Sequence, residues 1–376
     1  MNEQTGPAAG EKDGRAEALS RLPALLLPWY DENKRSLPWR ESKDPYRVWV
    51  SEIMLQQTRV EAAKEHYRRF LAELPTVADL AACDEKKLFK LWEGLGYYSR
   101  ARNLQKAAKI IAGKGFPQDA AGWRSLPGIG AYTAGAVCSI AFGLPTPAAD
   151  GNVVRVLSRL LGDARPQAQL RGEFEKELVP AYPKERCGDF TQSLMELGAT
   201  VCLPASPLCL ACPLLSLCAT KSDSLPTREK KAERRKTAVT LLLFSDGAHV
   251  ALCKRSEGVL KGMYAFFSVE TALSEEEVRD LLSAAGLKDF TVGERTTHKH
   301  VFTHIEWDMA AYTVALPEAE REEGAPFDPE RNLRVPGELL PQGCAHSDLA
   351  ALRWFSVGYA RENISLPSAF RWAFKA

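Results

Sequence analysis

Four cysteines crowded into one short stretch constrain this chain more than any other feature. Cys202, Cys209, Cys212 and Cys218 follow the spacing C-x6-C-x2-C-x5-C. Four thiolates this close together can close around a structural zinc ion or a [4Fe–4S] cluster. Zinc modules usually pair their ligands in two short CxxC knuckles, whereas this stretch has a single CxxC between wider gaps. The spacing therefore favours the cluster and leaves zinc open.

The bulk composition allows an ordinary globular protein. The chain has 376 residues, of which 45% are hydrophobic and 26% charged, and its formal net charge is +1. This length suggests two or three domains, and a neutral total charge still permits a basic face that binds nucleic acid. No apolar run is long enough to span a bilayer, and the polar N-terminus lacks a secretory signal. We therefore expect no membrane partner and a reduced, cytoplasmic location, at the nucleoid in a bacterium.

The pattern of apolar residues changes once along the chain. We predict a disordered tail over 1–15 and a mostly helical domain over 16–222, with the cysteine loop at 202–218. The polar, basic stretch 223–236 is typical of a linker, and 237–376 is predicted as an α+β domain. In that domain TAVTLLLF and HVALCKR alternate like strands, SEEEVRDLLSAAG is helical with Ser274 as its N-cap, and KHVFTHIEWDMAAYTVAL is β-like.

A glycine-containing break and a later aspartate stand out in the helical part. In SLPGIGAYTAGAV, Gly128 and Gly130 permit a tight turn before a helix whose free N–H groups can hold a DNA phosphate. Asp150 precedes the helical segment GNVVRVLSRL, where it can cap the N–H groups and stay ionised. Taken alone, the first motif also fits a plain helix–turn–helix loop, and the second fits a simple N-cap.

Together, the hairpin, the aspartate and the cysteine spacing resemble the helix–hairpin–helix superfamily of base-excision repair proteins that carry an iron–sulfur cluster. In its endonuclease III branch, the second position after the last hairpin glycine is a lysine that attacks the sugar. Tyr132 occupies that position here. The remaining matches are to the adenine DNA glycosylase branch, the MutY type, and they are SLPWR from Ser36, SEIMLQQT from Ser51, GLGYYSR from Gly94 and MELGA from Met195.

The resemblance implies the catalytic residues. Glu52 matches the general acid that protonates adenine N7, and its apolar neighbours favour the raised pKa that this task needs. Asp150 is implied to stabilise the oxocarbenium ion of the sugar or to form a transient covalent intermediate with it. Tyr132 is implied to orient these carboxylates, and Asn152 to hold the water or the acid network. Without the resemblance, Glu52 is an ordinary polar residue of an amphipathic helix.

The same resemblance implies residues that contact DNA. A base must leave the duplex before its glycosidic bond can be reached, and Gln57 and Tyr97 match the residues that fill the gap. Arg35, Arg40 and Gln192 align with contacts to the adenine base. Other members of the branch carry glutamate where this chain has Gln192.

The C-terminal half resembles the Nudix-like domain of this branch. Phe302, Thr303 and His304 occupy the segment where the family usually has Phe-Ser-His, which reads 8-oxoguanine on the opposite strand. Thr303 keeps a hydroxyl that can accept the N7–H by which 8-oxoguanine differs from guanine. Residues 262–268, GMYAFFS, depart from the usual GLWEFPG, and no glutamate set of a Nudix hydrolase is visible.

The sequence therefore predicts a monofunctional adenine DNA glycosylase with one [4Fe–4S] cluster. Its expected partner is double-stranded DNA containing A:8-oxoguanine or A:G mispairs, and we expect a monomer. The rival enzyme is an endonuclease III-type lyase, against which Tyr132 counts. A DNA-binding iron–sulfur protein without chemistry and a nucleotide hydrolase in the second half are further alternatives.

Overall fold

The computed structural model describes residues 9–227, 233–255, 258–327 and 349–374. These fall into two compact units, one formed by Met1–Cys83 with Ser99–Lys230 and the other by Asp84–Tyr98 with Lys231–Ala376. The predicted division along the chain placed 84–98 in the first domain, whereas the structure groups this segment with the second. Residues 1–8 of the predicted tail and 228–232 of the predicted linker lie outside the described residues.

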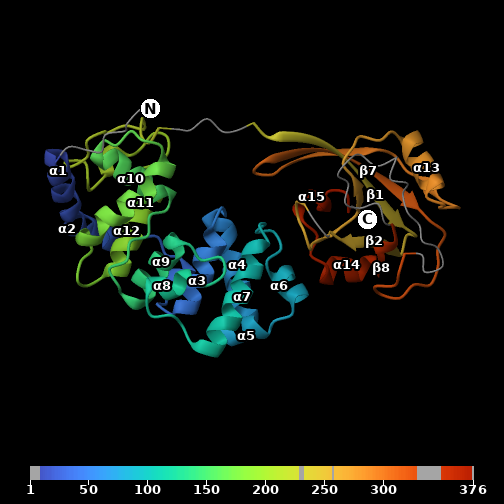
Figure 1. Cartoon of the computed structure of the whole chain (residues 1–376), viewed down its shortest axis with the longest axis horizontal. Helices are drawn as coiled ribbons and strands as arrows, with labels where there is room; N and C mark the ends of the chain where they lie inside the picture. Colours follow the sequence, from blue (N-terminus) through green and yellow to red (C-terminus); the bar gives the residue numbers. More distant parts are fainter. Residues whose placement is uncertain (1–8, 228–232, 256–257, 328–348, 375–376) are drawn as a thin grey trace. The chain divides into compact units, whose positions relative to one another are not determined.

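The first unit consists of helices and short 3-10 turns joined by loops (Figure 1). The elements are α1 (Ala9–Ser20), α2 (Leu22–Asn33), η1 (Pro38–Arg40), α3 (Pro45–Leu55), α4 (Val60–Glu73), α5 (Val77–Ala82), α7 (Ser99–Lys114), α8 (Ala120–Arg124), α9 (Ala131–Phe142), α10 (Gly151–Leu161), α11 (Gln167–Leu178), η2 (Val179–Ala181), α12 (Cys187–Thr200) and η3 (Cys209–Ala211). The mostly helical fold predicted for this part of the chain is confirmed.

Helix α1 corrects the prediction of a disordered tail over 1–15, because it already begins at Ala9. Arg15 explains the added order: its guanidinium lies 3.0 Å from Asp163 and 2.9 Å from Glu177. Leu19, on the same helix, is buried in the core that helices α2, α10, α11 and α12 share. An ion-pair network and one buried leucine thus hold a polar segment as a helix.

The loop before α10 packs directly onto helix α9. A Cβ placed on Gly135 of α9 would lie 2.0 Å from the carbonyl oxygen of Pro147. The end of the same stretch packs onto helix α12, where a Cβ on Gly198 would lie 2.6 Å from the Cβ of Asn152. Only glycine permits backbones to approach this closely, so these positions fix the course of residues 144–152.

The second unit is a mixed sheet with helices. Its elements are α6 (Glu85–Leu91), β1 (Arg235–Ser245), β2 (His249–Lys254), β3 (Tyr264–Ala265), β4 (Phe267–Val269), α13 (Glu275–Ala284), β5 (Thr291–Val292), β6 (Thr296–Val301), β7 (Ile305–Ala315), η5 (Leu349–Ala351), β8 (Arg353–Ser356), α14 (Val357–Asn363) and α15 (Ser368–Arg371). The strand order is β3-β2-β1-β7-β5, with β4 paired to β1, β6 to β7 and β8 to β2. Strands β1 and β7 are parallel, and the other pairings are antiparallel. This confirms the predicted α+β class.

Alternating side chains of β1 serve the two faces of the sheet. Leu242 and Phe244 belong to a core that includes α13, while Leu241 and Leu243 belong to a core that includes α14 and α15. The period of two is what a strand buried on both faces requires. Ser274 caps α13 through its hydroxyl, as predicted.

Two predicted boundaries in this unit shift. Strand β1 already begins at Arg235, inside the stretch predicted as linker, because its first residue pairs with Ile305 of β7. The β-like run beginning at Lys299 is not one strand: β6 ends at Val301 and β7 begins at Ile305. Residues 302–304 therefore form the turn of a hairpin, in which Thr303 and His304 are exposed.

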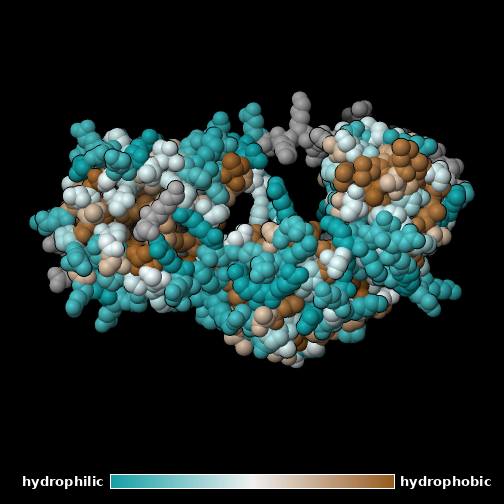
Figure 2. Space-filling view, turned by 180° about the vertical axis from the view of Figure 1, so that it is seen from behind, coloured by the Kyte–Doolittle hydropathy of each residue, from teal (hydrophilic) through white to brown (hydrophobic). Residues whose placement is uncertain are grey.

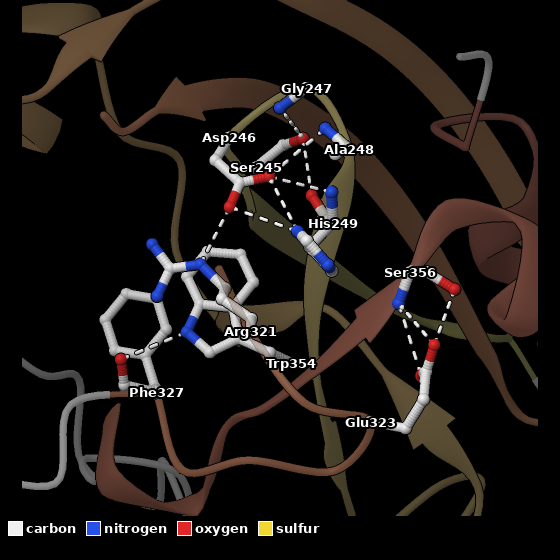
Figure 3. A network of polar contacts seen from close by, with 10 residues as sticks. All are labelled: Ser245, Asp246, Gly247, Ala248, His249, Arg321, Glu323, Phe327, Trp354 and Ser356. Atoms are coloured by element: carbon white, nitrogen blue, oxygen red, sulfur yellow. Dashed lines mark hydrogen bonds and ion pairs between the residues drawn. The ribbon is translucent and has the colours of Figure 1, made fainter. Parts of the chain in front are cut away.

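A buried carboxylate fastens the 317–327 segment to the sheet (Figure 3). The side chain of Asp246 is fully buried and accepts hydrogen bonds from Arg321 Nε at 2.7 Å and from the His249 N–H at 2.7 Å. The Arg321 guanidinium also lies 3.9 Å from the ring centre of Trp354. Burial acts to raise the pKa of Asp246, but these hydrogen bonds outweigh it and hold the pKa below its usual value.

The surface is mostly hydrophilic on the face seen in Figure 2, where hydrophobic residues gather in a few patches. Large exposed hydrophobic side chains include Leu208 and Leu210, beside Cys209, and Leu210 is 95% exposed. In the described part of the chain, every helix is too short or too polar to cross a membrane.

We predict that Gly135→Ala lowers the free energy of unfolding by about 1–3 kcal/mol, because the added methyl group collides with the Pro147 carbonyl. Gly172→Ala in α11 is the matched control, since a Cβ there meets nothing within 4 Å. The control should raise stability by about 0.5–1 kcal/mol. Urea unfolding of both variants checks the prediction, and a neutral Gly135→Ala would contradict it.

Candidate active site

Helix α3 places a carboxylic acid in the interior of the first unit. The helix begins with Pro45 after Asp44, whose side chain accepts the Arg47 N–H at 2.9 Å. Glu52 lies in its last turns and is only 7% exposed. Burial raises the pKa of Glu52 to about 7, since water no longer solvates its charge. This agrees with the raised pKa predicted from its apolar neighbours.

Helix α9 brings Tyr132 against this acid. The helix begins at Ala131 after Gly130, which caps it without a side chain. The Tyr132 hydroxyl donates a hydrogen bond of 2.6 Å to Glu52 Oε2. This hydrogen bond favours the ionised form of Glu52, while the nearby charge of Asp150 opposes it. The three side chains therefore form one electrostatic group.

Asp150 caps helix α10, as predicted. Its Oδ1 accepts the Val153 N–H at 2.7 Å, and its Oδ2 accepts the Asn152 amide at 2.9 Å. Burial has the largest effect and raises the pKa of Asp150, although both hydrogen bonds act to lower it. The helix terminus reduces the cost of burying the charge without removing it.

Asn152 connects Asp150 to the stretch that leads into the cysteine loop. Its Oδ1 accepts a 2.9 Å hydrogen bond from Arg155, which also donates to the carbonyl oxygens of Gly198 and Cys202. The side chain of Asn152 thus hydrogen-bonds both the Asp150 carboxylate and Arg155. Arg155 therefore connects the end of helix α12 and the first cysteine of the loop to Asn152, which hydrogen-bonds Asp150.

One cavity of about 560 Å³ gathers most of the predicted site. The predicted residues on its wall are Arg35, Arg40, Glu52, Gln57, Tyr132, Asp150, Asn152 and Gln192. A cavity of this volume is within the range of small-molecule sites and has room for a purine base. Its wall combines an acid, a second carboxylate and basic groups, which together can protonate a base and stabilise a developing cation.

Glu196 is a central residue of this cavity that the sequence analysis did not single out. It is 1% exposed, and its carboxylate accepts Arg35 Nε at 2.7 Å and Arg40 Nη2 at 2.7 Å. Burial acts to raise its pKa, but the two arginines outweigh burial and lower the pKa to about 2. Arg40 Nε also donates to Gln192 Oε1 at 3.1 Å. The signal was a glutamate four residues after Gln192, on the same helix face.

The hairpin glycines lie apart from this set. Gly128 has a φ of +77°, and a Cβ there would meet Asn103, so this position requires glycine. Gly130 has a φ of −93°, and a Cβ there would meet nothing within 4 Å, so its importance lies in capping α9 rather than in strain. Neither glycine is among the residues that line the 560 Å³ cavity.

The four cysteines converge on one small cavity. Cys202, Cys209, Cys212 and Cys218 line a space of about 30 Å³, and Arg159 Nη1 donates to Cys202 Sγ at 3.4 Å. They are not joined in disulfides. Among the described residues, no three cysteine, histidine or acidic side chains lie close enough together to hold a single metal ion.

The second unit brings two predicted DNA contacts together. Thr303, in the turn between β6 and β7, shares a 2.7 Å hydrogen bond with the hydroxyl of Tyr97. Tyr97 is 48% exposed and has a φ of +46°. The ring of Phe302 lies 4.8 Å from Trp307, and the Arg234 Nε donates to the Phe302 carbonyl at 3.1 Å. An aromatic anchor and a backbone hydrogen bond therefore hold the turn.

Comparisons with known proteins identify both halves. Residues 50–180 match the family described as HhH-GPD superfamily base excision DNA repair protein, and residues 239–376 match the NUDIX domain. An adenine DNA glycosylase of Buchnera aphidicola subsp. Baizongia pistaciae is 35% identical over 290 residues, which cover 74% of this chain and 82% of that protein. The chain belongs to the adenine DNA glycosylase family.

Other comparisons agree in part. The human adenine DNA glycosylase is 45% identical over 366 residues, covering 77% of this chain and 66% of that protein. A solved structure of a thermostable thymine-DNA glycosylase aligns with a TM-score of 0.51 at 27% identity, covering 55% of this chain and 97% of that one. The chain spans only 40% to 66% of the length of several glycosylase relatives that it matches.

The hydrogen bond between Tyr132 and Glu52 leads to a prediction about the pKa of Glu52. Because the Tyr132 hydroxyl stabilises the ionised form of Glu52, Tyr132→Phe should raise the pKa of Glu52 above its value of about 7. Carbon-13 NMR of the Glu52 carboxyl group as a function of pH measures this directly. Tyr67→Phe is the control, since that hydroxyl bonds the Arg47 carbonyl instead. An unchanged or lower midpoint in Tyr132→Phe would contradict the assignment.

Proposed function

We propose that this chain hydrolyses the N-glycosidic bond of adenine in double-stranded DNA, opposite 8-oxoguanine or guanine. The observation that carries this proposal is the pairing, in one cavity, of Asp150 with a buried Glu52 whose pKa is about 7. At neutral pH such an acid is protonated in a large fraction of molecules and can still give up its proton. A second carboxylate beside it suits a cationic intermediate.

The residues suggest a stepwise reaction. Adenine leaves a sugar poorly until it is protonated, and Glu52 would give its proton to N7. The C1′–N9 bond then breaks with its electron pair going to the base, and positive charge develops on the sugar. Asp150 stabilises this oxocarbenium ion or bonds transiently to C1′. Water adds to C1′ and returns a proton to the carboxylate pair, which leaves an abasic site.

Recognition of the base requires that the adenine leave the duplex. We propose that Arg35, Arg40 and Gln192 contact the extruded base inside the cavity, with Glu196 holding both arginines in place. Gln57 and Tyr97 would fill the gap left in the stack, because an amide can hydrogen-bond base edges and a phenol ring can stack. We also expect the enzyme to act as a monomer.

A lyase of the endonuclease III type is the rival activity. Such an enzyme needs a lysine that forms a Schiff base with the sugar, and Tyr132 occupies that position. No lysine is among the described residues that line the cavity. The monofunctional proposal therefore expects strand breaks only after alkali and no covalent adduct with borohydride. A trapped adduct would favour the lyase.

We also propose that the four cysteines hold a [4Fe–4S] cluster. The donor set fits, because four cysteines that form no disulfide line one cavity, and four thiolates are the ligand set of such a cluster. The cluster would supply iron–sulfur bonds that fix the loop, whose exposed Leu210 and neighbouring backbone lie outside the catalytic cavity. The hairpin at Gly128 and Gly130 would hold a DNA phosphate at the start of α9.

The turn at residues 302–304 is the proposed reader of 8-oxoguanine. Its Thr303 hydroxyl can accept the N7–H that guanine lacks, and Phe302 and His304 flank it. The hydrogen bond between Thr303 and Tyr97 supports this proposal, because it joins a residue that reads the lesion to one that fills the duplex. Replacement of the usual serine by threonine keeps the hydroxyl and adds a methyl group.

We predict that Glu52→Gln lowers single-turnover adenine release by about 10²–10⁴-fold while duplex binding persists, because the amide cannot donate the proton. The same change should stabilise the fold above neutral pH, where ionised Glu52 is buried at a cost. Glu65→Gln, on the exposed face of α4, is the matched control and should leave release unchanged. Normal release by Glu52→Gln would refute its role as the acid.

We predict that Thr303→Ala narrows the preference for A:8-oxoguanine over A:G by about tenfold, the value of one hydrogen bond to the lesion. Thr303→Ser keeps the hydroxyl and should retain the preference. Rates of adenine release from A:8-oxoguanine, A:G and A:C duplexes measure this. Equal losses on the first two substrates would remove the reading role from Thr303 and leave the glycosylase activity standing.

A further inference from the structure

The turn that follows the catalytic helix has an unusual residue at its tightest point. The Thr58 N–H donates to the Leu55 carbonyl at 3.2 Å, which closes a turn with Gln56 and Gln57 at its centre. Gln56 has φ −57° and ψ 112°, and Gln57 has φ +58°. These angles are those of a type II turn, whose third position is normally glycine. Gln57 holds that position here.

A left-handed glutamine is strained, and it persists only where its surroundings hold it. The strain coincides with a site, because Gln57 lines the catalytic cavity. A type I turn over the same four residues would relieve it, since its third position has a negative φ. The two turns differ by a flip of the central peptide, so the carbonyl of Gln56 points to opposite sides in the two cases.

Arg100 contacts that carbonyl. From helix α7, its Nη1 donates to the carbonyl of Gln56 at 2.5 Å, and to those of Ile53 at 2.8 Å and Met54 at 3.1 Å. The last two belong to the C-terminal turn of α3, where a cation is favoured by the helix dipole. Arg100 is therefore fixed by the helix end and can bond the Gln56 carbonyl in the type II turn alone.

We propose that Arg100 is a positioning residue that selects the type II turn and so directs Gln57 into the gap that the extruded base leaves in the duplex. The direction of Gln57 toward DNA rests on the proposed function, whereas the selection of the turn does not. A charged hydrogen bond that exists in one turn type only shifts the equilibrium toward it. The same guanidinium fixes the end of the helix that carries Glu52.

Arg100→Met tests this, because methionine keeps an unbranched apolar side chain and removes every donor. We expect a crystal structure of the variant to show a negative φ at Gln57. Single-turnover adenine release should fall by about tenfold or more, as expected when a reacting group is misplaced. The affinity for undamaged duplex should stay the same. Lys109→Met, at an exposed position of α7, is the matched control and should change neither quantity.

A second substitution separates turn selection from loss of stability. Asparagine adopts the left-handed conformation more readily than glutamine and keeps the carboxamide. Gln57→Asn should therefore reduce the rate loss caused by Arg100→Met, so that the two changes are not additive. If Arg100→Met does not fold, Arg100→Lys replaces it, with a smaller effect expected because an ammonium lacks the planar fork.

Three outcomes would overturn the proposal: a positive φ at Gln57 without Arg100, an unchanged rate in Arg100→Met, or an equal loss with and without Gln57→Asn. The proposed glycosylase activity fails in a different way. If the unaltered protein releases no adenine, that function is wrong, while the backbone angle at Gln57 still decides whether Arg100 selects the turn.

Discussion

The burial of the Glu52 carboxyl group is the interaction on which the candidate site depends. A carboxylic acid in water loses its proton far below neutral pH, and only removal from solvent brings its pKa to about 7. The Tyr132 hydrogen bond limits that rise, so the group stays within reach of ionisation. Helices α3 and α9 must pack against each other for both effects to occur, and the chemistry is therefore a consequence of helix packing.

Close backbone contacts fix the position of the second carboxylate, Asp150, relative to Glu52. Gly135 lets the Pro147 carbonyl touch α9, and Gly198 lets Asn152 touch α12. Asp150 lies between these two contacts, with its oxygens fixed by Val153 and by Asn152. Three helices thus position one side chain, which limits the reorganisation needed when charge develops on a substrate.

The sequence correctly predicted those strands and helix caps that depend on residue type and local spacing. The strands around Ser245, the cap at Ser274 and the cap at Asp150 follow from local rules and are present in the structure. The helix at Ala9 did not follow, because its Arg15 is held by Asp163 and Glu177, far along the chain. The turn at 302–304 did not follow either, since its aromatic and β-branched residues continue the pattern of the flanking strands. Burial also raises the pKa of Asp150 despite its hydrogen bonds at the helix terminus, an effect that depends on tertiary packing.

By itself, the sequence determined the two-part architecture, the four thiols in one loop and the chemical types available to the site. Periodicity and spacing are local properties, so they can be read without coordinates. Only the tertiary structure decided that Glu196 forms ion pairs with Arg35 and Arg40, and that Arg100 donates a hydrogen bond to the Gln56 carbonyl. These contacts join residues far apart in the chain, and their strength comes from burial and geometry that exist after folding.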